Sequence, residues 1–150
     1  MLRQGKEKQH FSVHYNIVKE HKVRVEDRII LAADGLTLDE TVELIRKVGK
    51  KVFGIKIHNL FDVFGRSAVE TIKAAGTYIV WVDAKLHDIP ETVKARTKVI
   101  EQSGANIVTV HATGGIKMMM AAREGTDIEV FGVTLLTSLS AQDIDSLFGR

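Results

Sequence analysis

The sequence predicts an α/β fold of the (β/α)8 TIM-barrel type, with only about the first five βα units present in its 150 residues. Short apolar runs alternate with longer amphipathic segments about every 25 residues, which is the rhythm of parallel βαβ units. The short runs are rich in β-branched residues and apolar throughout, as in a sheet covered on both faces. Polar residues follow the carboxyl ends of successive runs, where the loops of a barrel converge on one mouth.

The first unit pairs a strand at 28–33 with a helix at 36–48. Thr37 is the candidate N-cap of this helix, and Glu40 follows three residues later, which completes the capping-box pattern. Gly49 comes directly after the last apolar position and is expected to end the helix.

The following units repeat this pattern. Gly76, Gly104 and Gly125 each follow an amphipathic segment and are expected to end a helix. Pro90 stands at the first turn of another helix, where its missing N–H is tolerated. The remaining strands are expected at 52–57, 78–82, 107–110 and 128–136, and the remaining helices at 67–75, 90–103, 116–124 and 141–148.

Two closures fit this alternation, an eightfold barrel and an open doubly wound sheet. No Gly-x-Gly-x-x-Gly follows the first strand and no Walker loop occurs anywhere. A complete barrel takes about 250 residues, so we expect residues 28–150 to form a partial barrel that carries the catalytic groups. The polar residues at strand ends, which favour the barrel, are Asp34, Lys56, Asp83 with Lys85, His111, and Thr137 with Ser138.

The composition narrows the classes of function. With 45% hydrophobic and 27% charged residues, the chain resembles ordinary soluble globular domains. The absence of cysteine excludes disulfides and thiolate metal sites. No apolar run approaches the roughly 20 residues of a membrane span, and basic residues are spread without a nucleic-acid recognition motif. We therefore expect a cytoplasmic protein that binds neither a membrane nor nucleic acid.

Residues 1–27 differ from the rest, because they are rich in Lys, Arg, His and Gln and have little apolar periodicity. We interpret them as an N-terminal extension that is partly disordered or lies on the surface. His10 and His14 have the i, i+4 spacing of helical metal ligands. Without a third ligand in a convincing pattern, a solvated surface pair is the preferred interpretation.

The segment after the third strand carries three charges of alternating sign, Asp83, Lys85 and Asp88. Strand residues two apart point to the same face, so Asp83 and Lys85 are expected side by side. Burying such charges is costly unless they pair. Spacing alone leaves two readings about equally open, a structural ion-pair network and a functional site.

Asp83-Ala84-Lys85-Leu86-His87-Asp88-Ile89-Pro90-Glu91-Thr92 resembles the signature of the orotidine 5′-phosphate decarboxylase family. The shorter Asp-x-Lys-x-x-Asp is shared with 3-keto-gulonate-6-phosphate decarboxylases and hexulose-phosphate synthases, but the Ile-Pro-x-Thr continuation favours the orotidylate branch. Four further segments agree in order with that family: Ile30–Asp34, Gly54–Lys56, Thr109–Gly115 and Gly132–Ser138.

The resemblance implies decarboxylation of orotidine 5′-phosphate to uridine 5′-phosphate, a step of pyrimidine biosynthesis, without a cofactor or a metal. It implies a catalytic array of Lys56, Asp83, Lys85 and Asp88, in which Lys85 protonates C6 of the pyrimidine. A fixed cation beside that carbon stabilises the charge that develops as CO2 departs.

The resemblance also implies substrate-binding roles for Asp34, Ile89, Thr92 and Ser140. Asp88 and Thr92 would reach the neighbouring site of a homodimer. Asp34 and Ser140 each have a local alternative, as a turn residue and as a helix N-cap.

His58 departs from the family pattern, because a glycine is usual two residues after the lysine that Lys56 matches. Two alternatives to the leading function stay open. One is a sugar-phosphate decarboxylase or synthase of the same superfamily, which would use its aspartates to bind a metal. The other is an inactive barrel fragment that binds a nucleotide.

Overall fold

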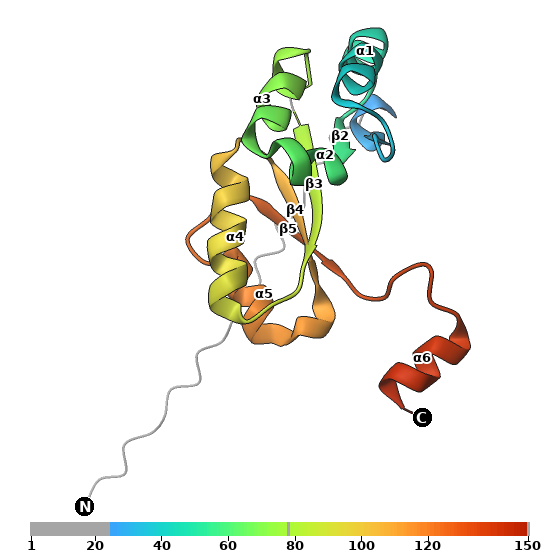
Figure 1. Cartoon of the computed structure of the whole chain (residues 1–150), viewed down its shortest axis with the longest axis vertical. Coiled ribbons are helices and arrows are strands. Elements are labelled where there is room, and N and C mark those ends of the chain that lie inside the picture. The colour runs from blue at the N-terminus through green and yellow to red at the C-terminus, as the bar shows by residue number, and fades with distance from the viewer. Residues whose placement is uncertain (1–24, 78, 150) are drawn as a thin grey trace, which may run out of the picture.

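The computed structural model describes residues 25–77 and 79–149. Its centre is one five-stranded sheet in the order β1-β2-β3-β4-β5, in which every neighbouring pair is parallel (Figure 1). A doubly wound sheet reverses its strand order at a switch point, whereas a barrel adds strands in chain order. The observed order therefore confirms the barrel-type progression. The strands are β1 Ile30–Ala32, β2 Gly54–Ile57, β3 Ile79–Leu86, β4 Ile107–His111 and β5 Glu129–Val133.

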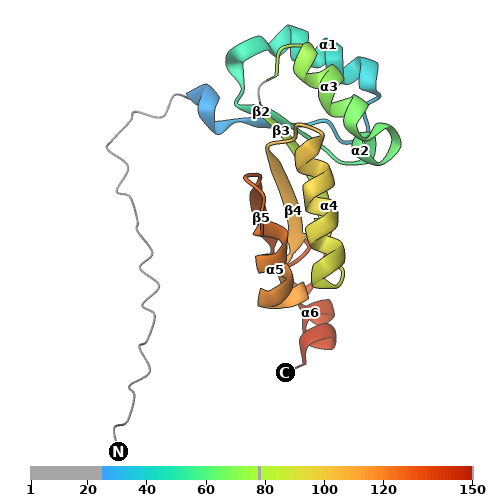
Figure 2. The same ribbon diagram turned by 90° about the vertical axis from the view of Figure 1, so that its left-hand side faces the viewer.

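Helices follow the strands along the chain. α4 and α5 lie side by side, and α5 contacts β4 and β5 (Figures 1 and 2). The α-helices are α1 Leu38–Val48, α2 Asn59–Phe64, α3 Arg66–Ala74, α4 Pro90–Gln102, α5 Gly115–Arg123 and α6 Ala141–Phe148. Short 3-10 helices lie at η1 Val25–Arg28, η2 Gly49–Lys51 and η3 Ala112–Gly114.

The core lies between the sheet and the helices. Alternate residues of the three central strands are almost completely buried there, while the residues between them face the opposite side of the sheet. That opposite face carries Lys56 and Thr109, and the rings of Trp81 and Phe131 meet on it edge to face at 5.4 Å. The core residues of these strands are Ile55, Ile57, Val80, Val82, Val108 and Val110.

Helix α1 begins as predicted. Thr37 is its N-cap, and both halves of the capping box with Glu40 are present. Gly49 is its C-cap, with a φ of 55° that a glycine adopts without strain. The local sequence therefore determines both ends of this helix.

The predicted ends of several strands were wrong. β3 continues to Leu86 rather than ending at 82, because Leu86 pairs with Val110 after a shift in register. β5 covers only Glu129–Val133 of the expected 128–136. β1 begins at Ile30, since the residues just before it form η1.

Helix α2 was not predicted. Its six residues, Asn59–Phe64, are too few to show a clear helical periodicity. The expected pair of His10 and His14 lies outside the described residues, so it stays a prediction.

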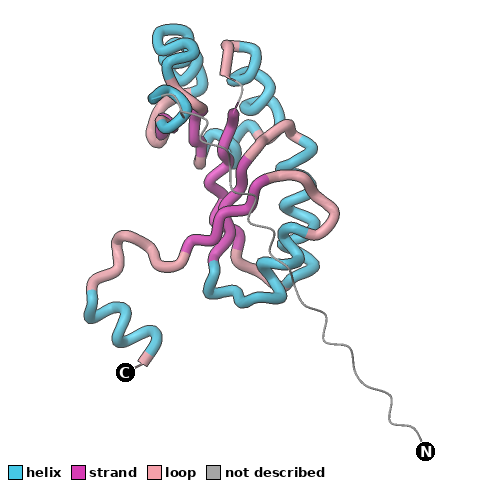
Figure 3. Tube along the Cα trace, turned by 180° about the vertical axis from the view of Figure 1, so that it is seen from behind, coloured by secondary structure: helices cyan, strands magenta, loops and turns pink. Residues whose placement is uncertain are grey.

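After β5 the chain leaves the sheet and ends in α6, which stands apart from the other helices (Figures 1 and 3). Ser140 is the N-cap of α6, and it forms a capping box with Asp143. In the described part of the chain, no helix is long and apolar enough to cross a membrane.

Candidate active site

The backbone of β3 departs from regular strand geometry at its carboxyl end. The register against β4 shifts between Val82 and Leu86, as at a β-bulge. Lys85 has a φ of 44°, the one positive value among the described non-glycine residues. Such a conformation costs roughly 1–2 kcal/mol for a residue with a Cβ. Strain of this kind concentrates at functional sites, where surrounding contacts maintain it.

Asp83 is the centre of a chain of four charged side chains from three strand ends. Its Oδ2 accepts hydrogen bonds from Lys85 Nζ at 2.6 Å and from Lys56 Nζ at 3.1 Å. Lys56 Nζ also donates to Asp34 Oδ2 at 2.8 Å. The prediction that strand-end residues gather at one edge of the sheet therefore holds for these four. Charges of alternating sign lie in contact, so each lysine is neutralised by an adjacent carboxylate.

Two further groups hold Asp83 in place. Thr109 Oγ1 on β4 donates to Asp83 Oδ1 at 2.8 Å and accepts the backbone N–H of Lys85 at 2.9 Å. His58 Nδ1 lies 2.8 Å from the backbone carbonyl oxygen of Asp83. Because a carbonyl only accepts, this contact requires the tautomer with hydrogen on Nδ1. No local pattern assigns Thr109 this role, since only the pairing of β3 with β4 brings its hydroxyl to Asp83.

The surroundings of Asp83 and Lys56 favour the charged form of each side chain. Burial by itself would raise the pKa of Asp83, but hydrogen bonds from Lys85, Thr109 and Lys56 outweigh it and lower the pKa to about 2. Burial would likewise lower the pKa of Lys56, but its bonds to Asp34 and Asp83 raise it overall. Asp83 is thus a carboxylate and Lys56 an ammonium at neutral pH.

The other predicted site residues lie outside this cluster. Asp88 accepts a hydrogen bond from the N–H of Ile89 at 2.7 Å and, among the described residues, makes no hydrogen bond or ion pair with Lys85. Ile89 precedes α4 and is 66% exposed, and Thr92 lies in the first turn of α4. Ser140 serves as the N-cap of α6. The catalytic role predicted for Asp88 and the substrate-binding roles predicted for Ile89, Thr92 and Ser140 stay predictions.

Two histidines lie next to Lys85. The rings of His87, after β3, and His111, at the end of β4, are 5.2 Å apart and tilted. Burial lowers the pKa of His111, and the nearby His87 and Lys85 add to this effect. Within residues 25–77 and 79–149, no group of three His, Asp or Glu side chains is placed to hold a metal ion.

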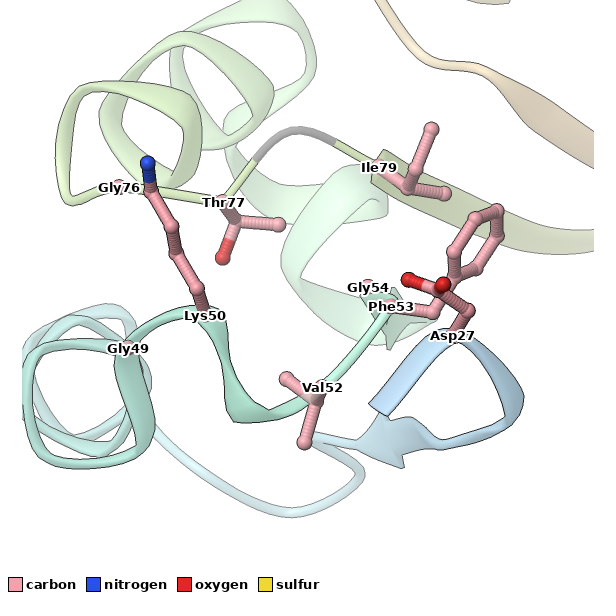
Figure 4. Close-up of a pocket in the computed structure, with 9 residues that line it drawn as sticks. All are labelled: Asp27, Gly49, Lys50, Val52, Phe53, Gly54, Gly76, Thr77 and Ile79. Atoms are coloured by element: carbon pink, nitrogen blue, oxygen red, sulfur yellow. The ribbon is translucent and has the colours of Figure 1, made fainter. Parts of the chain in front are cut away.

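A separate pocket lies at the opposite end of the strands (Figure 4). It is lined by residues at the amino ends of β2 and β3, including Gly54 and Ile79, with Lys50 and Asp27 on opposite sides of it. Catalytic residues of β/α barrels lie at the carboxyl ends of strands. The charged cluster, rather than this pocket, is therefore the candidate active site.

A family model described as "Orotidine 5'-phosphate decarboxylase / HUMPS family" matches residues 27–148. The chain belongs to this family. That match takes in all five strands and the charged cluster. The orotidine 5′-phosphate decarboxylase of Desulfosudis oleivorans is 38% identical over 122 residues, and that of Saccharophagus degradans 37% over 126. These alignments cover 79% and 80% of this chain, and 49% and 52% of the relatives.

Solved structures with a similar fold include members of the same family. An uncharacterized conserved protein from Geobacillus kaustophilus matches with a TM-score of 0.71 at 32% identity, over 81% of this chain and 61% of that one. Orotidine 5′-phosphate decarboxylase from Lactobacillus acidophilus matches with a TM-score of 0.69 at 30% identity, over 79% and 57%. The family and the fold predicted from the sequence are confirmed, and the chain spans about half the length of the curated relatives.

Proposed function

We propose that this chain contributes the charged array of an orotidine 5′-phosphate decarboxylase site. The observation that carries the proposal is the contact chain Asp34–Lys56–Asp83–Lys85 at the carboxyl ends of neighbouring strands. Membership of the family supplies the reaction, the conversion of orotidine 5′-phosphate to uridine 5′-phosphate and CO2 in pyrimidine biosynthesis.

The difficult step is the loss of CO2 from C6. When the bond to the carboxylate carbon breaks, its electron pair remains on C6, which has no adjacent group to accept it. An ammonium held beside C6 stabilises that charge and then transfers a proton to the carbon. Lys85 has this role in the proposal, and it regains its proton from solvent after product leaves. The array performs this step without a metal or a cofactor.

The neighbours of Lys85 orient it. Asp83 binds Lys85 Nζ at 2.6 Å and Lys56 Nζ at 3.1 Å through one oxygen, so the two cations are held on the same side of the carboxylate. Asp83 lies against the substrate carboxylate in the ground state, and that contact is relieved when CO2 departs. Asp34, whose side chain is 53% exposed, contacts the ribose, and Ser140 contacts the pyrimidine.

The site is completed in a homodimer. Asp88 and Ile89 are exposed, and Asp88 makes no ion pair with Lys85 of its own chain within the described residues. These features support a role for Asp88, Ile89 and Thr92 in the site of a second subunit. A two-fold interface makes such an exchange reciprocal, because each subunit gives the other the same residues.

The direct test measures CO2 release and uridine 5′-phosphate formation by the protein that carries this chain, expressed in full. Lys85→Ala is expected to lower kcat by at least about a thousandfold, because it removes both the cation and the proton. Lys98→Ala, which removes an exposed lysine of α4, is the matched control and should retain activity.

Three results would contradict the proposal. Equal activity in Lys85→Ala and Lys98→Ala would remove Lys85 from the reaction. Turnover that depends on added magnesium would favour a metal-using sugar-phosphate relative. Tight binding of a uridylate analogue with no CO2 release would favour an inactive nucleotide-binding role.

The dimer is tested by mixing two inactive variants. A Lys85→Ala subunit paired with an Asp88→Ala subunit forms one site with both defects and one site with none. An equal mixture should therefore recover about a quarter of the wild-type activity, if subunits exchange freely in a two-fold dimer. A mixture as inactive as its components, with hybrid dimers shown by mass spectrometry, would place Asp88 outside the shared site.

A further inference from the structure

We propose that Thr109 is a positioning residue whose hydroxyl sets the relative geometry of Asp83 and Lys85. The proposal deepens the function proposed above and rests on it. Thr109 is 2% exposed and lies on β4, on the same face of the sheet as the charged array. It therefore acts on the array through Asp83 and the Lys85 backbone, without contacting a substrate.

One hydroxyl of Thr109 joins two parts of the site. It donates to Asp83 Oδ1 at 2.8 Å, while both ammonium groups bind the other oxygen, Oδ2. A carboxylate bound only through Oδ2 could rotate about its Cβ–Cγ bond. The bond from Thr109 fixes the plane of the carboxylate, and with it the position of the two lysine Nζ atoms.

The same hydroxyl accepts the N–H of Lys85 at 2.9 Å. This amide lies in the stretch of β3 where the register against β4 shifts. Bulges leave backbone groups without their ladder partner, and a buried N–H without an acceptor is costly. Thr109 supplies that acceptor at the residue with the positive φ. It thereby stabilises the backbone conformation at Lys85 in which Lys85 Nζ contacts the Asp83 carboxylate.

A valine at this position would keep the shape of threonine but lose both hydrogen bonds. In Thr109→Val, Asp83 Oδ1 and the Lys85 N–H would be left without these partners. We expect kcat to fall about 10- to 100-fold, because small displacements of a reacting group have effects of that size. KM should stay within about twofold, since Thr109 does not touch substrate. Thr109→Ser keeps the hydroxyl and should restore most of kcat.

Thr97 offers a matched control. It is a completely buried threonine of α4, and its hydroxyl has no hydrogen-bond partner among the described residues. Thr97→Val therefore makes the same chemical change in a buried position without removing a bond. It is expected to leave both kcat and KM unchanged.

The experiment combines kinetics with a titration that needs no turnover. Steady-state kcat and KM are measured for wild type, Thr109→Val, Thr109→Ser and Thr97→Val in the protein that carries this chain, expressed in full. The Asp83 carboxyl is titrated in the same proteins by carbon-detected NMR. The charged groups around it are Lys56, Lys85 and, beyond Lys56, Asp34, with the His58 ring on its backbone carbonyl. Loss of the Thr109 bond should raise the pKa of Asp83 above its value of about 2.

The outcomes separate the two proposals. A lower kcat and a raised Asp83 pKa in Thr109→Val, both reversed in Thr109→Ser, support the positioning role. Wild-type kcat in Thr109→Val, equal impairment of the serine and valine variants, or an unchanged Asp83 pKa would overturn it. A wild-type protein without decarboxylase activity would refute the proposed function, and the titration would still decide whether Thr109 controls the carboxylate.

Discussion

Removing the charge of Asp83 should make the protein less stable at neutral pH, and this loss should disappear in acid. In Asp83→Asn, Lys56 and Lys85 lose the carboxylate that both contact. The pKa of Asp83 in the folded protein, about 2, is below the ordinary 3.8. A carboxyl with a lowered folded-state pKa contributes stability above its unfolded-state pKa, and loses it as pH falls toward the folded-state value.

The size of the effect follows from that difference. The pKa falls from 3.8 to about 2, and at about 1.4 kcal/mol for each pKa unit this gives an upper limit of about 2.5 kcal/mol above pH 5. The side chain of Lys85 is 34% exposed, so solvent screens part of this interaction. We therefore expect wild type to be more stable than Asp83→Asn by about 1–2 kcal/mol at pH 7. About half of that difference should remain at pH 3, and little at pH 2.

The measurement is urea denaturation of both proteins at a series of pH values from 7 to 2. Asp62→Asn, which removes an exposed carboxylate of α2, controls for the change in net charge. The informative quantity is the difference in the free energy of unfolding between wild type and Asp83→Asn, since every other carboxyl titrates in both proteins. A difference that stays constant between pH 5 and pH 2 would refute the assignment of a lowered pKa to Asp83.

Two further substitutions test how the scaffold holds the site. A Cβ at Gly54 would lie 2.6 Å from the backbone oxygen of Ile79, so Gly54→Ala must separate β2 from β3. It should cost about 1–3 kcal/mol in urea denaturation, and an unchanged midpoint would show that the strands adjust freely. Thr37→Ala removes both side-chain bonds of the α1 N-cap and should cost about 1 kcal/mol. Thr37→Ser should recover most of it, and equal losses in the two variants would exclude the cap as the cause.

Local sequence predicted the features that depend on local chemistry. Thr37 and Glu40 form the expected capping box. Asp83 and Lys85 are in contact as their spacing predicts, although the backbone between them departs from regular strand geometry. The contact between Asp34 and Lys56 could also be predicted from the sequence, because parallel strands bring their carboxyl ends to one edge of the sheet.

Other features depend on tertiary pairing and had no local signal. The extension of β3 to Leu86 rests on its partner Val110, and the register shift appears only when β4 is beside it. Thr109 reads locally as an ordinary β-branched strand residue. Its function as a hydrogen-bonding partner of Asp83 exists only because β3 and β4 are neighbours.

The backbone of Lys85 has a consequence for engineering this protein. A design calculation that scores each residue by its fit to the local backbone would replace Lys85. Glycine or asparagine adopts a φ of 44° more readily than lysine does. Substitutions chosen for stability alone would thus remove the Lys85 ammonium group. The protein would become more stable but would lose the proposed chemistry. Design on this scaffold should hold position 85 fixed and seek added stability at helix caps and in the core, away from the mouth of the sheet.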